Sequence, residues 1–138
     1  MPTAREFAVQ MEDRPGTIGQ LCQALANCGV NILGFQASYS ERRTEVRLVV
    51  DKPAAAETAL SAEASAYTEF EVAQVSLPHR PGELARAASR LGDANININY
   101  AYFGLEPATN APLIFFGVTA VGRAAKILDQ AAAAAAGT

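Results

Sequence analysis

The sequence predicts an α+β fold built from two copies of one small module. A short Arg-Pro-Gly motif occurs twice, 66 residues apart, at Arg14–Gly16 and Arg80–Gly82. Seven of the 24 residues in Val9–Ile32 are identical in the second copy, where about one or two would match by chance, and such repetition marks duplicated units. Apolar residues alternate before each motif and recur at helical spacing after it, which predicts a strand and then a helix.

The duplication predicts two modules, one over residues 1–70 and one over residues 71–138. No Gly/Ser/Pro-rich linker separates them, so we expect a rigid fusion. Modules of about 65 residues bury little apolar surface alone. We therefore expect the modules to pack on a neighbour or on a second chain.

The first copy is predicted to begin with a half-buried strand, because apolar residues alternate with others from Phe7 to Met11. Asp13–Gly16 then turns the chain. An apolar helix face follows, made of Ile18, Leu21, Cys22 and Leu25. Gly29 is a natural stop for this helix.

The remainder of the first copy predicts a hairpin and a second helix. Val30–Tyr39 and Thr44–Asp51 are expected to be its strands, joined by a turn at residues 40–43. Pro53 is suited to the first position of a helix, which we expect to run to about Ala66. The element order is strand, helix, strand, strand, helix.

The second copy repeats this order from Thr68–Leu77, which is the last strand of the first copy, the first strand of the second, or both. Its helix face consists of Leu84, Ala87, Ala88 and Leu91, and Asn95 replaces Gly29 as a residue that tolerates a left-handed helix end. Further strands are expected at Ile96–Phe103 and Leu113–Val121.

A final helix is predicted from about Gly122, and Ala131–Ala136 either extend it or fray. No strand is predicted after it, so the second copy lacks its last strand. Leu113–Phe116 and the Val30–Tyr39 strand are apolar on both faces, and such strands are covered on both. Because helices can cover only one face, we expect a second sheet, supplied by a homodimer.

Composition excludes several classes of protein. Half of the residues are hydrophobic, 18% are charged and the net charge is −3. This composition is typical of a globular protein. The sequence lacks the basic stripe that nucleic-acid binding needs. No run of residues is long and apolar enough to span a membrane, and no signal segment is evident, so a cytoplasmic protein is expected. Cys22 and Cys28 are six apart on a predicted helix and are expected to stay reduced, with no metal site and no cofactor.

Each Arg-Pro-Gly loop leads into a helix N-terminus, where unpaired N–H groups and the helix dipole favour an anion. Gly16 and Gly82 leave room for a ligand to approach the main chain. A carboxylate fits such a place. Asp13, and Asn31 after the helix, offer acceptors for an ammonium group. Together these groups are what a free α-amino acid requires.

The pattern Asp-Arg-Pro-Gly-Thr-Ile, a helix, and then Gly-Val-Asn-Ile resembles the ACT domain, a ferredoxin-like βαββαβ module that binds amino acids in metabolic regulation. Asn31 lies eighteen residues after Asp13, and Asn97 lies eighteen after His79. The resemblance covers nearly the whole chain, twice. The segments at residues 77–82 and 96–102 are especially similar to small stand-alone tandem-ACT proteins.

The resemblance implies that ligand is held at an interface between two ACT units by the polar residue of the turn and by the Asn before the Ile. The candidate ligand-binding residues are Asp13, Arg14, Gly16, Thr17, Ile18, Asn31 and Ile32 in the first copy, and His79, Arg80, Gly82, Glu83, Leu84, Asn97 and Ile98 in the second. Family members that bind serine often carry His where this chain has Met11 and Leu77, so an apolar amino acid fits better. Because the turn residues differ, the two sites are expected to be inequivalent.

Each feature also has a purely structural interpretation. Asp13 could cap the helix, which contributes about 1 kcal/mol, and His79 could be a turn residue without a ligand. The arginines of the two motifs could be solvated or ion-paired, and the two asparagines could satisfy buried backbone groups. Tyr100 and Tyr102 could belong to a core or an interface rather than to a pocket wall.

Three functions are consistent with the sequence. The first is a non-catalytic regulatory protein that binds a small amino acid and acts in trans on a metabolic enzyme. The second is a structural dimerisation module without a ligand. The third is a ferredoxin-like enzyme that uses His79, the only histidine, although neither a dinucleotide-binding nor a P-loop motif is present.

Overall fold

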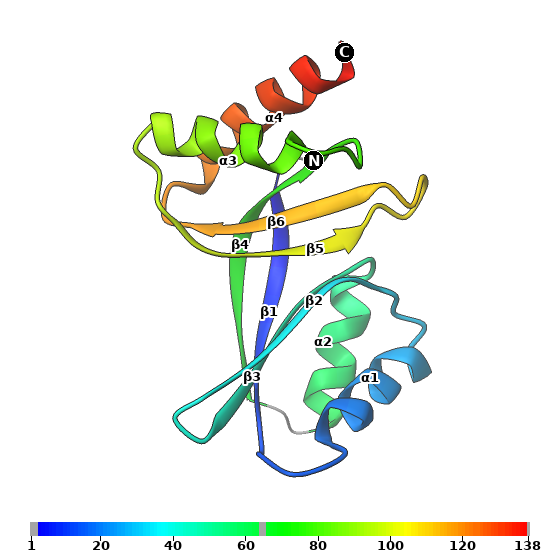
Figure 1. Ribbon diagram of the computed structural model, residues 1–138. Coiled ribbons are helices and arrows are strands. Elements are labelled where there is room, and N and C mark those ends of the chain that lie inside the picture. Colours follow the sequence, from blue (N-terminus) through cyan, green and yellow to red (C-terminus); the bar gives the residue numbers. More distant parts are fainter. Residues whose placement is uncertain (1–2, 64–65, 138) are drawn as a thin grey trace. The chain divides into compact units, whose positions relative to one another are not determined.

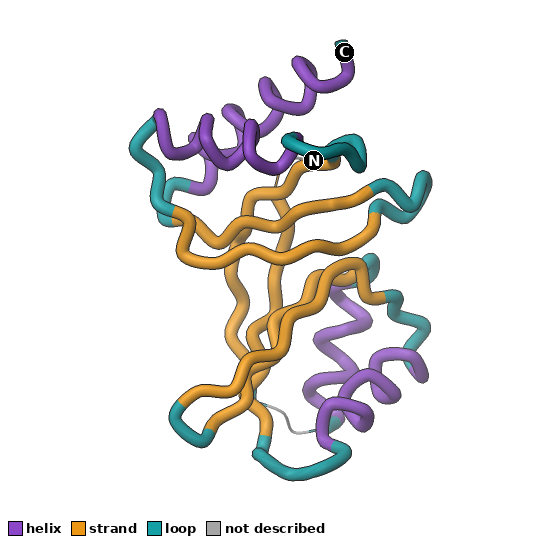
Figure 2. The backbone as a smooth tube through the Cα atoms, viewed as in Figure 1, coloured by secondary structure: helices purple, strands orange, loops and turns teal. Residues whose placement is uncertain are grey.

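The computed structural model describes residues 3–63 and 66–137 as an α+β fold in which the strand pairs within each half are antiparallel (Figures 1 and 2). The elements in chain order are β1 Thr3–Met11, α1 Thr17–Asn27, β2 Ile32–Ser40, β3 Arg43–Val50, α2 Pro53–Ala62, β4 Tyr67–Ser76, α3 Glu83–Asp93, β5 Ile98–Leu105, β6 Pro112–Val118 and α4 Val121–Ala136. None of these helices is long and apolar enough to cross a membrane.

The chain divides into two compact units, and the division falls inside a strand. The first unit is Arg5–Phe70. The second begins at Glu71 and also takes in Thr3 and Ala4 at the start of β1. β4 is continuous across the division, so its first residues belong to one unit and its last residues to the other.

In the first unit, β3 pairs with both β1 and β2, and Val46 lies opposite Val9 on one side and Ala37 on the other. Helices α1 and α2 pack beside this sheet (Figure 1). Leu25 and Leu60 bring the helices into the core, because both side chains are completely buried. The core cluster consists of Phe7, Val9, Leu21, Leu25, Val30, Val46, Leu48, Val50, Ala56, Ala59 and Leu60.

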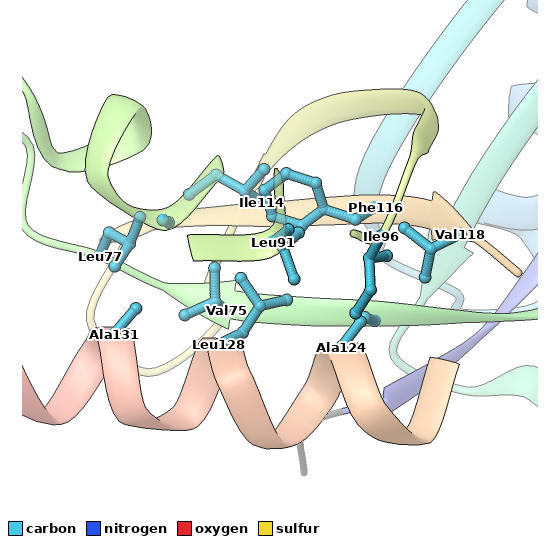
Figure 3. Close-up of a cluster of buried hydrophobic side chains, with 12 residues drawn as sticks. Val75, Leu77, Leu91, Ile96, Ile114, Phe116, Val118, Ala124, Leu128 and Ala131 are labelled. Carbon is cyan, nitrogen blue, oxygen red and sulfur yellow. The ribbon is translucent and has the colours of Figure 1, made fainter. Parts of the chain in front are cut away.

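In the second unit, β6 pairs with both β4 and β5. Leu91 of α3 and Leu128 of α4 are completely buried, and both point into the core drawn in Figure 3. Ala131 belongs to the same cluster. α4 runs to Ala136, so the alanines at residues 131–136 extend the helix. This agrees with the high helix propensity of alanine.

The sequence repeat is also a repeat of backbone structure. α1 and α3 have eleven residues each, and both bounds are shifted by the same 66 positions. The irregularity in β2 between Ile32 and Gly34 recurs in β5 between Ile98 and Tyr100. Asn95 has a φ of 61°, which confirms that it takes the left-handed place of a glycine.

Several expected boundaries are shifted. β5 lies two residues later than expected and β6 ends at Val118, three residues early. α2 ends at Ala62 rather than Ala66, although residues 64 and 65 of the expected helix lie outside the described residues. These differences arise at element ends, where periodicity gives little information.

The expectation that β1 is half-buried is wrong, because four consecutive residues from Glu6 to Val9 are buried. Glu6 is completely buried, and an ion pair with Arg47 of β3, with Nη1 and Oε1 2.8 Å apart, offsets the cost of burying its carboxylate. Leu113–Phe116 are likewise buried within the single chain. Their apolar character therefore no longer argues for a homodimer.

Candidate functional site

Both Arg-Pro-Gly loops have the same backbone. Gly16 precedes α1 with φ 91° and ψ −9°, and Gly82 precedes α3 with φ 88° and ψ −10°. This left-handed conformation favours glycine. No side chain caps either helix, so the interpretation of Asp13 as a helix cap is wrong.

The first loop borders an open hollow of about 420 Å³, within the size range of small-molecule sites. Its lining consists of the loop, the first turn of α1 and Thr44 of β3. A Cβ atom placed on Gly16 would meet no atom within 4 Å. The main chain at the start of α1 therefore faces open space, as a carboxylate would require.

Thr17 and Arg14 hold the first loop in place. The buried Thr17 hydroxyl lies 3.2 Å from both the Glu12 and the Arg14 carbonyl oxygens and can donate to either. Arg14 pairs with Glu12 at 2.8 Å, but both side chains are more than half exposed, and such pairs contribute little. The Arg14 side chain is thus largely exposed, and it also lines the hollow.

The second loop is organised around a buried carboxylate. Glu83, the first residue of α3, is 4% exposed. Arg86 Nη2 lies 2.7 Å from Glu83 Oε1, and Arg80 Nε lies 2.9 Å from Oε2. Hydrogen bonds from Arg86 and Arg80 hold the pKa of Glu83 below its usual value, against the effect of burial.

The two arginines also contact the surroundings of the second loop, and Glu83 and Arg86 line a hollow of about 420 Å³ between α3 and α4. A Cβ atom placed on Gly82 would lie 3.0 Å from Arg86 Nη1. Arg80 Nη2 donates to the carbonyl oxygen of Ala135, near the end of α4, at 3.2 Å. The second loop is therefore covered by Arg86 and tied to the last helix.

The two predicted halves of each amino-acid site do not meet within one copy. Asp13 precedes α1 and Asn31 follows it, and eleven helical residues span about 16 Å. The Asn31 main chain instead exchanges hydrogen bonds with Asp51, at 2.9 and 3.1 Å. His79 and Asn97 lie at opposite ends of α3 in the same way.

The other predicted residues have different surroundings. Ile18 and Ile32 pack against the core of the first unit, and Ile98 packs against that of the second. Leu84 is 38% exposed and His79 is exposed. The Asn97 amide donates to Asn99 at 3.4 Å. Within the described ranges, no three His, Cys, Asp or Glu side chains are grouped so that they could hold a metal ion.

The contacts of Arg86 and Ala135 did not follow from the sequence patterns. The spacing of Glu83 and Arg86 is a usable signal, because residues three apart on a helix are neighbours. Ala135 has no such signal, since a carbonyl acceptor is independent of residue type.

Comparisons with known proteins show the fold. No family model and no curated protein matches the sequence. A solved structure of a Bacteroides thetaiotaomicron protein is similar, with a TM-score of 0.82 and 20% identity, covering 94% of this chain and 88% of that one. The ligand-free regulatory subunit of aspartate kinase from Thermus thermophilus has a TM-score of 0.63 at 19% identity, over 94% and 92%.

A third similar structure is E. coli aspartokinase III in complex with lysine and aspartate, with a TM-score of 0.57, 12% identity, and coverage of 96% of this chain and 31% of that one. The chain has an ACT-like fold. At these identities the likeness establishes the fold and no more.

Proposed function

We propose that the protein is a non-catalytic regulatory protein that binds a small amino acid at interfaces between ACT units. One observation carries the proposal. The Gly16 loop presents the start of α1 to an open hollow of about 420 Å³, and a Cβ atom placed on Gly16 would meet no atom within 4 Å. Free N–H groups and the helix dipole favour a carboxylate there, and Asp13 lines the same hollow as an acceptor for ammonium.

The finer arrangement is part of the proposal. The chain consists of two ACT modules, residues 1–70 and 71–138, and the second lacks a last strand of its own. The distance between Asp13 and Asn31 along α1 supports a site completed by the Asn of another ACT unit. A second copy of the chain would supply it, which makes the protein a homodimer.

Binding at an interface would couple ligand to assembly, because a ligand favours the state that completes its contacts. A metabolic enzyme would read that state in trans. The similar aspartate kinase regulatory subunit is consistent with such a division of labour. The absence of His at Met11 and Leu77 favours an apolar amino acid over serine.

Thermal unfolding in the presence of each of the twenty amino acids tests the proposal. A ligand specific to the native state stabilises it by about 2.7 kcal/mol at a hundredfold excess over its dissociation constant. We expect one or a few amino acids to raise the melting temperature. Asp13→Ala should abolish that shift, because it removes the acceptor for the ammonium group.

Gln23→Ala is the matched control, since Gln23 is exposed on α1 and away from the loop. It should leave the ligand-induced shift unchanged. Absence of a shift with all twenty amino acids would contradict the proposal.

A structural dimerisation module is the second candidate. Phe103 and Leu105 share a face of β5 and are each 55% exposed, and exposed apolar patches mark interaction sites. Sedimentation of Phe103→Asp separates the two functions. Loss of a dimer with no amino-acid effect in the parent protein favours the structural module.

A further inference from the structure

We infer that the second Arg-Pro-Gly loop is closed by its own Glu83 carboxylate, and that amino acid is taken by the first loop alone. This inference rests on the proposed function. It assigns to Glu83 the role of a residue that determines which of two duplicated loops can be occupied.

The two loops differ first in the charge at the helix N-terminus. Glu83 is an acidic residue in the first turn of α3, whereas the first turn of α1 contains none. The residue of the first copy that corresponds to Glu83 is Thr17, which is neutral. Glu83 therefore complements the positive end of the α3 dipole from within the helix, whereas the carboxylates at the first hollow, Glu12 and Asp13, come from the loop before α1.

The position of Glu83 strengthens this difference. Its side chain is 4% exposed and accepts hydrogen bonds from Arg80 and Arg86. Arg80 and Arg86, the cations that could bind a ligand carboxylate, are thus already paired with the Glu83 carboxylate. A second carboxylate placed beside Glu83 would also be repelled by its charge, and this repulsion is strong in a partly buried place.

Access to the main chain differs as well. The Cβ position of Gly16 has open space around it, while that of Gly82 is 3.0 Å from the Arg86 guanidinium. The residue that corresponds to Arg86 in the first copy is Gln20, which has no charge to hold it against a carboxylate. Arg86 therefore covers the face of the second loop that remains open in the first.

The Arg80–Ala135 hydrogen bond keeps the second loop in this state. The last carbonyl groups of a helix carry partial negative charge and attract cations. In the first loop, Arg14 instead pairs with the exposed Glu12. The second loop is thus anchored to α4, and Arg80 is engaged by the Ala135 carbonyl oxygen as well as by Glu83.

Amide NMR of the full chain tests the inference loop by loop. The probe is a mixture of the twenty amino acids at millimolar concentration, added to isotope-labelled protein. We expect the Gly16, Thr17 and Ile18 amide signals to move and the signals of residues 82–84 to stay in place.

Movement of the signals at residues 82–84 overturns the inference while leaving the proposed function intact. Signals that stay in place at both loops overturn the proposed function, and the inference fails with it. The two failures are therefore distinguishable in one spectrum.

A double variant, Glu83→Thr with Arg86→Gln, gives the second loop the side chains of the first. We expect its amide signals at residues 82–84 to respond to the same mixture. Arg90→Gln is the control, because Arg90 lies on α3 outside the Glu83 cluster. If the double variant folds but its second loop stays silent, Glu83 and Arg86 do not close it. Should the double variant not fold, Glu83→Thr alone, which removes the carboxylate, gives the same decision.

Discussion

The two halves of the chain bury a charge in different places on the same backbone. The first half buries Glu6 of β1 in an ion pair with Arg47 of β3 and leaves its loop open. The second half buries Glu83 at its loop and has the apolar Val72 at the position 66 residues after Glu6. A duplicated motif therefore preserves a backbone without preserving the side chains beside it, because Glu83 and Arg86 stand where the first copy has Thr17 and Gln20.

The largest effect is expected when the first half loses its buried ion pair. Arg47→Met removes the cation that faces the Glu6 carboxylate, and breaking a buried pair costs about 3–5 kcal/mol. Urea unfolding measures this loss. Adding Glu6→Val, which introduces the residue of the second half, should recover most of it. If Arg47→Met were as stable as the parent protein, the buried ion pair would not distinguish the two halves.

The cores provide a matched test of equivalence. Leu25 and Leu91 correspond in sequence and are both completely buried. Leu25→Ala and Leu91→Ala should each lower the free energy of unfolding by about 2–5 kcal/mol, through lost burial and a cavity. Urea unfolding of the two variants side by side should give similar losses. A large loss in one variant and none in the other would break the equivalence.

The glycines sharpen the comparison of the loops. Gly16→Ala and Gly82→Ala each force a left-handed conformation on a residue with a Cβ atom, at a cost of about 1–2 kcal/mol. Thermal unfolding should show both losses. Gly82→Ala should in addition displace the Arg86 guanidinium. Gly16→Ala should displace no side chain, because the space around that position is open. A harmless Gly16→Ala would contradict the described loop conformation.

The smallest effect concerns pH. The pKa of Glu83 is lowered in the folded state by its bonds to Arg86 and Arg80, so the folded protein favours the ionised form. The resulting stability is fully present above the unfolded pKa of about 4.3 and is lost as pH falls through the lower folded pKa. Glu83→Gln should flatten this acid limb of a melting-temperature profile. If Thr17→Val flattened the acid limb equally, the pH dependence would not come from Glu83.

The sequence predicted those helix ends that depend on the backbone preference of a single residue. Pro53 begins α2, and Asn95 adopts the left-handed conformation, because each depends on its own backbone preference. The repeat located both loops and both eleven-residue helices. Burial of Glu6 did not follow, since it depends on Arg47, 41 residues away.

The candidate site was predictable only in part. The loop glycines and Asp13 were found from spacing, but their separation from Asn31 is a consequence of where α1 runs. The closure of the second loop requires Arg80, Glu83 and Arg86 to be recognised as one cluster. Its tie to the Ala135 carbonyl could not be foreseen, because it depends on where α4 ends beside the loop.

The most direct test of the account is a calorimetric titration of the purified protein with the amino acid that gives the largest thermal shift. Because the first loop is open and Glu83 closes the second, one molecule of amino acid should bind per chain. The Glu83→Thr, Arg86→Gln variant should bind two. Two molecules bound per parent chain, or none, would contradict the account.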